Sequence, residues 1–141
     1  MSSKALVTGG LGWLGSRLIQ RLMHEKREIV CVDFYDAGKN KVPEFLRDYD
    51  KLKIVNGDIR KPHEFIEELK DCNTVFNCAA LQHTKFTSDI YGVNRDGATN
   101  LLRLCIKSNV PKFIHVSSCS VHGCSKDTDN PITEKTLLNP I

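Results

Sequence analysis

The sequence lacks any run of about 18 apolar residues, which excludes a membrane-spanning helix within it. It also lacks a strong charge of either sign, since its 141 residues carry a formal net charge of only +3 and their lysines and arginines are scattered. Nucleic-acid-binding domains concentrate basic residues on one face, so we predict no nucleic-acid partner. No secretory leader precedes the first apolar segment, and we therefore expect a cytoplasmic protein.

The cysteines lack the spacing of a zinc knuckle. Six cysteines are present, and none belongs to a Cys-x-x-Cys pair. Four residues of metal-binding type do lie close together in the chain, namely His115, Cys119, His122 and Cys124. His115 falls in a predicted strand, however, and structural zinc sites usually carry paired cysteines. We therefore predict no metal site, and we expect reduced thiols rather than a disulfide framework.

Glycine, in contrast, is concentrated where the first predicted strand ends. Residues 5–7 form a short apolar run typical of a buried parallel strand, and Gly9, Gly12 and Gly15 follow it. In such a pattern one glycine permits a tight turn, one lets backbone amides approach a pyrophosphate, and one lets the helix pack closely on the sheet. The helix predicted over 14–23 directs its N-terminal N–H groups at the phosphates. This stretch indicates a dinucleotide site.

A carboxylate follows at the distance that such a site requires. The second predicted strand, 28–32, leads into Asp33, 18 positions after Gly15. An acidic residue about 20 positions beyond the glycines can hold the ribose hydroxyls of NAD. No arginine directly follows Asp33, and no basic residue lies within 9–15, so a 2′-phosphate would lack a counter-charge. We therefore predict NAD rather than NADP as the cofactor.

The remaining pattern alternates strands and helices throughout the chain. Further strands are predicted over 51–55, 74–78 and 112–116, the first of them a half-exposed edge strand because its lysines alternate. Helices are predicted over 43–49, from residue 62 onward and over 88–108. This order predicts an α/β fold with a doubly wound parallel sheet of the Rossmann type, formed as one domain over 1–141. Residues 117–141 form a serine segment and a loop.

Several polar and small residues are expected at the carboxyl edge of this sheet. Asp58 could accept a hydrogen bond from an adenine amino group, or it could belong to a plain turn. Ala79 and Ala80 leave room for a ligand to lie across the strand ends. Asn94 lies on the inner stripe of the long helix, so its amide needs a partner in a cofactor, in the next strand's end or in a local backbone group. Ser118 follows the fifth strand.

These stretches together resemble the extended short-chain dehydrogenase/reductase family, which contains NAD-dependent epimerases, dehydratases and 3β-hydroxysteroid dehydrogenases. The resemblance spans the whole chain and rests on five motifs in the family's order. They are Thr8-Gly9-Gly10-Leu11-Gly12-Trp13-Leu14-Gly15, Gly57-Asp58-Ile59, Asn77-Cys78-Ala79-Ala80, Val93-Asn94-Arg95-Asp96-Gly97-Ala98-Thr99-Asn100 and Val116-Ser117-Ser118-Cys119-Ser120-Val121-His122-Gly123.

The resemblance implies a role for each motif. Ser118 would hydrogen-bond the hydroxyl or carbonyl that reacts. The residues implied to bind NAD are Gly9, Gly12, Trp13, Leu14, Gly15, Asp33, Asp58, Ile59, Cys78, Ala79, Ala80 and Asn94. His122 stands where the family usually has tyrosine.

The chain also departs from the family in what it lacks. Family members are about twice as long. Their Tyr-x-x-x-Lys acid/base pair has no counterpart here beyond Tyr49 and Lys53, a pattern that begins before the third strand and is interpreted as a coincidence. The resemblance therefore implies the cofactor-binding portion of an oxidoreductase, epimerase or dehydratase. Such an enzyme acts by hydride transfer on a sugar nucleotide or sterol-like substrate, and a homodimer is one oligomeric state it could adopt.

Two other functions remain open. A non-catalytic NAD-binding module that regulates or binds a partner chain would show the same glycine turn and the same carboxylate. A methyltransferase shares those features as well, but it explains neither Gly15 nor the serines after the fifth strand, so it ranks last.

Overall fold

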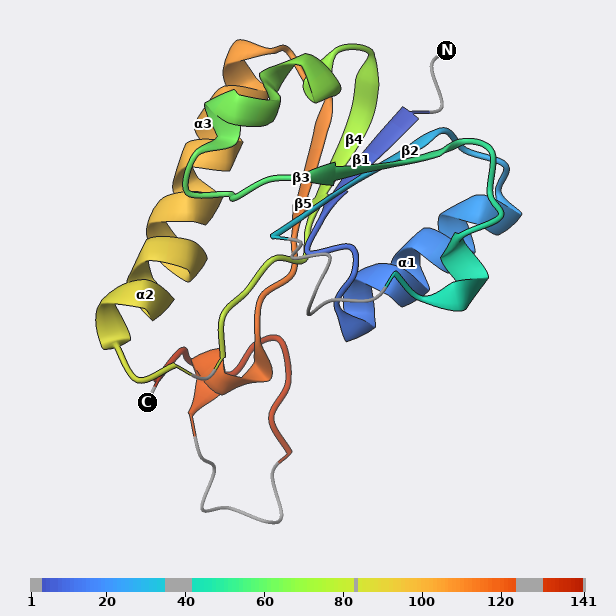
Figure 1. The fold of residues 1–141 in the computed structure, drawn as a ribbon. Coiled ribbons are helices and arrows are strands. Elements are labelled where there is room, and N and C mark those ends of the chain that lie inside the picture. Colours follow the sequence, from blue (N-terminus) through green and yellow to red (C-terminus); the bar gives the residue numbers. More distant parts are fainter. Residues whose placement is uncertain (1–3, 35–41, 83, 124–130, 141) are drawn as a thin grey trace.

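A single parallel sheet organises the computed structural model, which describes residues 4–34, 42–82, 84–123 and 131–140. Its strand order is β3-β2-β1-β4-β5, so the chain builds outward from β1 in one direction and then in the other (Figure 1). This is the predicted doubly wound Rossmann arrangement. The strands are β1 (Lys4–Thr8), β2 (Ile29–Asp33), β3 (Leu52–Asn56), β4 (Cys72–Asn77) and β5 (Lys112–His115).

Helices lie on both sides of the sheet. Helix α1 (Trp13–His24) lies on one side, and the long helical segment labelled α2 and α3 lies on the other (Figure 1). That segment consists of α2 (Thr87–Tyr91), the π-helical turn η3 (Gly92–Gly97) and α3 (Ala98–Lys107). Three 3₁₀ segments complete the described chain: η1 (Glu44–Leu46), η2 (Pro62–Leu69) and η4 (Cys119–His122).

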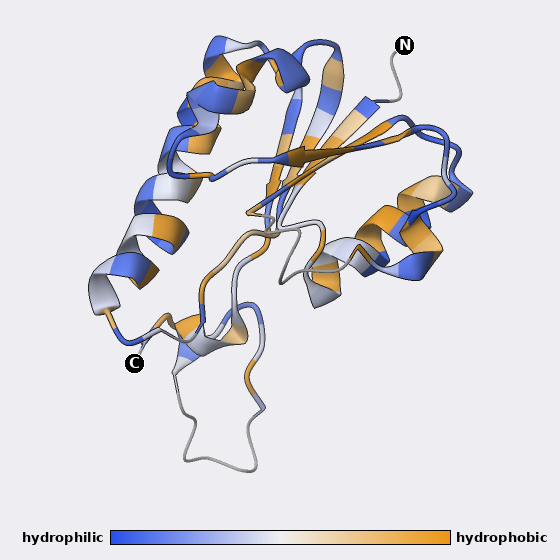
Figure 2. Cartoon of the chain, in the orientation of Figure 1, coloured by the Kyte–Doolittle hydropathy of each residue, from blue (hydrophilic) through white to orange (hydrophobic). Residues whose placement is uncertain are grey.

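The central strand is buried on both faces, and this divides the core into two clusters. Ala5 and Val7 pack with Ile19 and other residues of the α1 side, whereas Leu6 packs with Leu101 of α3 on the opposite side. All five side chains are fully buried, and each large apolar one contributes about 1.5–3 kcal/mol relative to exposure. Hydrophobic residues accordingly concentrate in the strands, while the helices alternate between hydrophobic and hydrophilic residues (Figure 2).

Three local predictions can be compared with this fold. The long helix predicted over 88–108 is present at 87–107, but its middle turn is π-helical. The helix predicted over 43–49 was too long, because only Glu44–Leu46 forms a 3₁₀ turn. Strand β3 lies at the sheet edge and is half-exposed, as its lysines predicted. Among the residues that the structure describes, no helix is long and apolar enough to span a membrane.

Candidate cofactor site

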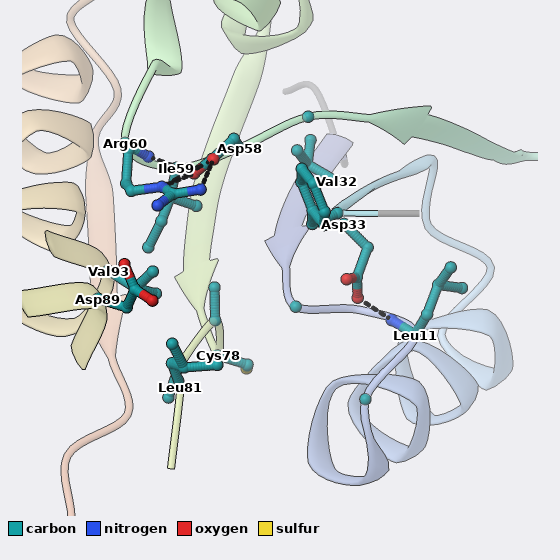
Figure 3. A pocket seen from close by; sticks show the side chains of 16 residues that line it. Leu11, Val32, Asp33, Asp58, Ile59, Arg60, Cys78, Leu81, Asp89 and Val93 are labelled. Carbon is teal, nitrogen blue, oxygen red and sulfur yellow. Dashed lines mark hydrogen bonds and ion pairs between the residues drawn. The ribbon is translucent and has the colours of Figure 1, made fainter. Parts of the chain in front are cut away.

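A cavity of about 660 Å³ opens at the carboxyl ends of β1 to β4, where the strand order reverses. Ligands of open α/β sheets bind at such a switch point. One wall comes from the glycine turn and the end of β2, another from the segment after β3, and the far wall from α2 and η3 (Figure 3). The lining residues are Gly9, Leu11, Gly12, Val32, Asp33, Phe34, Gly57, Asp58, Ile59, Arg60, Cys78, Ala79, Ala80, Leu81, Asp89 and Val93.

The glycine turn brings backbone close to backbone at the floor of this cavity. Gly9 has a φ of +66°, and a Cβ there would lie 2.7 Å from the Cα and N atoms of Ala79. The turn is closed by a hydrogen bond of 3.1 Å from Gly12 N to Gly9 O. A Cβ on Gly15 would collide with the Gly9 carbonyl oxygen, so Gly15 serves the packing of α1 and does not line the cavity.

The start of helix α1 suits an anion. Its N-cap is Gly12, which has no side chain to bond the first-turn N–H groups, and the first turn contains no acidic residue. These N–H groups and the positive end of the helix dipole are therefore available to a phosphate. Trp13 and Leu14 begin the helix, 80% and 45% exposed, and lie outside the lining of the cavity.

Asp33 joins the tip of β2 to the glycine turn. Its Oδ2 accepts a hydrogen bond of 2.7 Å from the backbone N–H of Leu11 (Figure 3). Burial raises the pKa of this carboxyl, and the backbone N–H groups of Leu11, Phe34 and Gly12 oppose that rise only in part. The residue thus presents a partly buried acceptor to the cavity, at the place where the sequence predicted a ribose-binding carboxylate.

Asp58 forms an ion pair across its own turn. Its Oδ1 accepts a hydrogen bond of 2.9 Å from the backbone N–H of Arg60, and its Oδ2 lies 2.6 Å from Arg60 Nη2. Burial acts to raise the pKa of Asp58, but the hydrogen bonds and charge of Arg60, together with Lys61, outweigh it and the net shift is downward. The Asp58 side chain thus takes part in its own turn, and Asp58 and Ile59 both line the cavity, where the adenine contact of Asp58 stays a prediction.

Asn94 is satisfied by local backbone. Its Oδ1 accepts a hydrogen bond of 2.8 Å from Leu81 N, and its Nδ2 donates one of 2.9 Å to Leu81 O. Asn94 therefore holds the segment after β4 against the long helix and does not itself line the cavity. Cys78, Ala79 and Ala80 belong to that segment and do line it.

Ser118 lies apart from the cavity lining. It is exposed and caps η4, where its Oγ accepts a hydrogen bond of 3.1 Å from Ser120 N. His122 ends the same 3₁₀ turn, and its Nδ1 is the one buried side-chain N or O atom without a hydrogen-bond partner among the described residues. No cluster of metal-ligating side chains occurs in the described part of the chain, and Cys124 lies outside it.

The isolated Tyr-x-x-x-Lys sequence lies far from this edge of the sheet. The hydroxyl of Tyr49 donates a hydrogen bond of 2.7 Å to the carbonyl of Arg27, which precedes β2. Tyr49 is therefore at the amino ends of the strands, whereas Ser118 follows the carboxyl end of β5. This position agrees with its interpretation as a coincidence.

Sequence reasoning missed half of the residues that line the cavity. Arg60 could have been noticed from its spacing to Asp58, and Asp89 and Val93 from their positions on one helical face. Leu11, Val32 and Phe34 flank predicted site residues, and their inward placement depends on the turns. The missed residues are Leu11, Val32, Phe34, Gly57, Arg60, Leu81, Asp89 and Val93.

The model of the NAD dependent epimerase/dehydratase family matches residues 5–141. The chain belongs to this family. It is 31% identical to a UDP-glucose 4-epimerase of Lactobacillus helveticus over 98% of its own length and 42% of the relative's. It is 30% identical to the sterol-4-alpha-carboxylate 3-dehydrogenase, decarboxylating, of Saccharomyces cerevisiae over 89% of its length and 37% of the relative's.

Solved structures of similar proteins agree with this membership. A dTDP-glucose 4,6-dehydratase from Streptomyces venezuelae, solved with NAD and TYD bound, superposes with a TM-score of 0.85 at 27% identity. The match covers 97% of this chain and 45% of that one. The chain therefore spans less than half the length of the epimerase/dehydratase relatives described here. NAD, the cofactor expected from the glycine turn and Asp33, is the cofactor in the family's name.

Proposed function

We propose that the cavity binds NAD. The observation that carries this proposal is the convergence on one cavity of the glycine turn, an uncapped helix N-terminus and Asp33. The backbone N–H groups at the start of α1 would hold the pyrophosphate, and the Asp33 carboxylate would accept hydrogen bonds from the ribose hydroxyls. The turn also requires glycine at position 9, because a Cβ there would lie 2.7 Å from Ala79 backbone atoms.

The charges that line the cavity favour NAD over NADP. Among the residues that the structure describes, three carboxylates, on Asp33, Asp58 and Asp89, line it together with one cationic side chain, that of Arg60. Arg60 is already paired with Asp58. An additional phosphate on the ribose would face the Asp33 carboxylate, and like charges at short distance repel.

We infer that the chain is the cofactor-binding portion of an enzyme that acts on a hydroxyl or carbonyl of a sugar nucleotide or sterol-like substrate. The support is the family membership and the names of the relatives. NAD, when bound, supplies a hydride acceptor. Ser118 would orient the reacting oxygen, while a general base, which contributes about 10²–10⁴-fold, is not provided by the Tyr-x-x-x-Lys pattern within these 141 residues.

Titration calorimetry with NAD and NADP tests the cofactor proposal. We expect NAD to bind and NADP to bind at least about fivefold more weakly, since one phosphate-carboxylate contact of this kind costs roughly 1 kcal/mol or more. Asp71→Asn, at an exposed residue just before β4 at the opposite end of the sheet, serves as a control that keeps wild-type affinity. Equal affinity for both nucleotides, or no binding of either, would overturn the proposal.

A non-catalytic NAD-binding module is the second candidate. Strand β5 pairs only with β4 in the described sheet, so its other edge is open to a partner chain. This open edge favours the module. Tyr91, Leu102 and Ile106 are exposed along one side of the long helix, and a homodimer would bury them. A Tyr-x-x-x-Lys encoded beyond Ile141 favours the enzyme, whereas NAD binding without turnover by the native assembly favours the module.

A further inference from the structure

Three polar side chains form a row across the ends of β1, β4 and β5. Thr8 is the register partner of Asn77, and Asn77 is the register partner of His115. Paired residues of neighbouring strands project to the same face, so the three side chains lie side by side. Thr8 and Asn77 are completely buried, so every polar atom of theirs needs a partner within the protein.

The distances fix the direction of the hydrogen bonds in this row. Thr8 Oγ1 and Asn77 Oδ1 are 2.6 Å apart, a length typical of O–H···O and short for N–H···O. The Thr8 hydroxyl is therefore the donor, and the amide of Asn77 must direct its Nδ2 at His115. Nδ2 lies 3.1 Å from His115 Nδ1. An amide nitrogen only donates, so Nδ1 accepts and the ring proton resides on Nε2.

The row runs from the strand that leads into the glycine turn to the strand that leads into the serine segment. Thr8 directly precedes Gly9, whose turn approaches Ala79. Asn77 also receives a backbone hydrogen bond of 3.0 Å from Val116 N, which extends the pairing of β4 with β5. Ser118 lies three positions after His115 in the chain.

We propose that His115 is a positioning residue. Its neutral imidazole, protonated on Nε2, accepts a hydrogen bond from the Asn77 side chain. This bond holds the end of β5, and the serine segment that follows it, in register with the glycine turn. The role of this register in cofactor binding rests on the proposed function. Asn77 is buried but His115 is exposed, so without the imidazole acceptor the Asn77 N–H would have to bond water that enters beside β5 or move together with the strand end.

Nitrogen NMR on the full chain tests the tautomer. At about pH 8, above the range in which histidine ordinarily titrates, we expect His115 to carry its proton on Nε2 and the Asn77 side-chain amide to exchange slowly with solvent. A proton on Nδ1 would overturn the assignment, because Asn77 would then have to be turned around.

Two variants test the positioning role. His115→Phe removes the acceptor and keeps a ring, whereas His115→Gln keeps a side-chain acceptor. We expect the Phe variant to speed amide exchange of both Val116 and Gly9 and to weaken NAD binding by about three- to tenfold, the effect of one hydrogen bond. We expect the His115→Gln variant to restore most of the amide protection and most of the NAD affinity. His63→Phe, an exposed histidine on η2, is the control.

The outcomes separate this proposal from the proposed function. If wild-type protein does not bind NAD but Val116 and Gly9 respond together to His115→Phe, the cofactor proposal fails and the register role stands. If exchange changes at Val116 alone and NAD affinity is unchanged, His115 is only a local contact and the positioning role is wrong. If the Phe variant does not fold, the Gln variant and the tautomer measurement still decide.

Discussion

The Asp33 carboxylate accepts a 2.7 Å hydrogen bond from the backbone N–H of Leu11, which ties the tip of β2 to the glycine turn. Two chain segments that lie 22 residues apart thereby form one wall of the cavity. The same carboxyl has a pKa that burial raises above its ordinary value of 3.8. The ionised carboxylate therefore destabilises the folded protein, although it is the form proposed to bind the ribose hydroxyls.

Asp33→Asn should separate these two effects. The amide oxygen can still accept from Leu11, but the charge is lost, so we expect NAD binding to weaken by at least about tenfold. Stability at pH 7 should rise, with the melting temperature higher by about 2–4 °C. A raised carboxyl pKa costs stability as pH increases through it, so the advantage of the variant should shrink as pH falls toward 3.8. Melting curves across pH measure this, and a variant less stable than wild type at pH 7 would contradict it.

Gly9→Ala should destabilise the fold and abolish NAD binding. The added Cβ would require an unfavourable positive φ and would lie 2.7 Å from Ala79 backbone atoms. We expect a loss of about 1–3 kcal/mol in the free energy of unfolding, measured by urea denaturation. Gly92→Ala is the matched control, because its Cβ would meet only Arg60 Cδ at 3.7 Å. Alanine there should be neutral or stabilising by up to about 1 kcal/mol.

Arg60→Met should remove an acid-sensitive contribution to stability. Asp58 has a lowered pKa in the folded protein, with Arg60 as the main lowering influence, so the pair stabilises the fold above pH 3.8 and loses that effect as pH falls through the folded value. We expect a loss of at most about 1 kcal/mol at pH 7, because the Arg60 side chain is half-exposed. Chemical denaturation at pH 7 and near pH 3 measures the difference.

The control for that pair is the exposed Arg21–Glu25 pair on α1. Arg21→Met should change stability by less than about 0.5 kcal/mol at either pH. Equal effects of the two methionine variants would show that the Asp58–Arg60 pair has no special role.

Asn94→Ala should free the segment that follows β4. Both hydrogen bonds to Leu81 are lost, and we expect a cost of about 1–3 kcal/mol with faster amide exchange at Leu81. Asn100→Ala, at an exposed asparagine of the same long helix, should change neither quantity appreciably. Hydrogen exchange at Leu81 that is unaffected by Asn94→Ala would disprove the holding role.

Purified alone, the 141-residue chain should not oxidise a substrate. The Tyr-x-x-x-Lys sequence it contains lies at the wrong end of the sheet, and an unactivated serine is a poor base at neutral pH. Absorbance of NADH during incubation with sugar nucleotides and sterols measures this. Steady NADH production that follows the protein through purification would contradict the expectation.

Local sequence patterns were sufficient to predict the fold of this chain. Short apolar runs, the glycine spacing and the amphipathic helices are properties of neighbouring residues, and the preference for right-handed crossovers then leaves few arrangements. The same logic placed Asp33 and Ala79 at the carboxyl edge, because each follows a strand directly. Both line the cavity.

The tertiary structure decided what these residues contact. The Asn94 side chain bonds the Leu81 backbone. Asp89 reaches the cavity because the long helix passes over the strand ends, and Arg60 reaches it because of the turn that follows β3. The row from Thr8 to His115 exists only in the observed strand register. Periodicity along the chain specifies which face a residue presents, whereas its partner depends on how distant segments pack, and no stretch of sequence contains that information by itself.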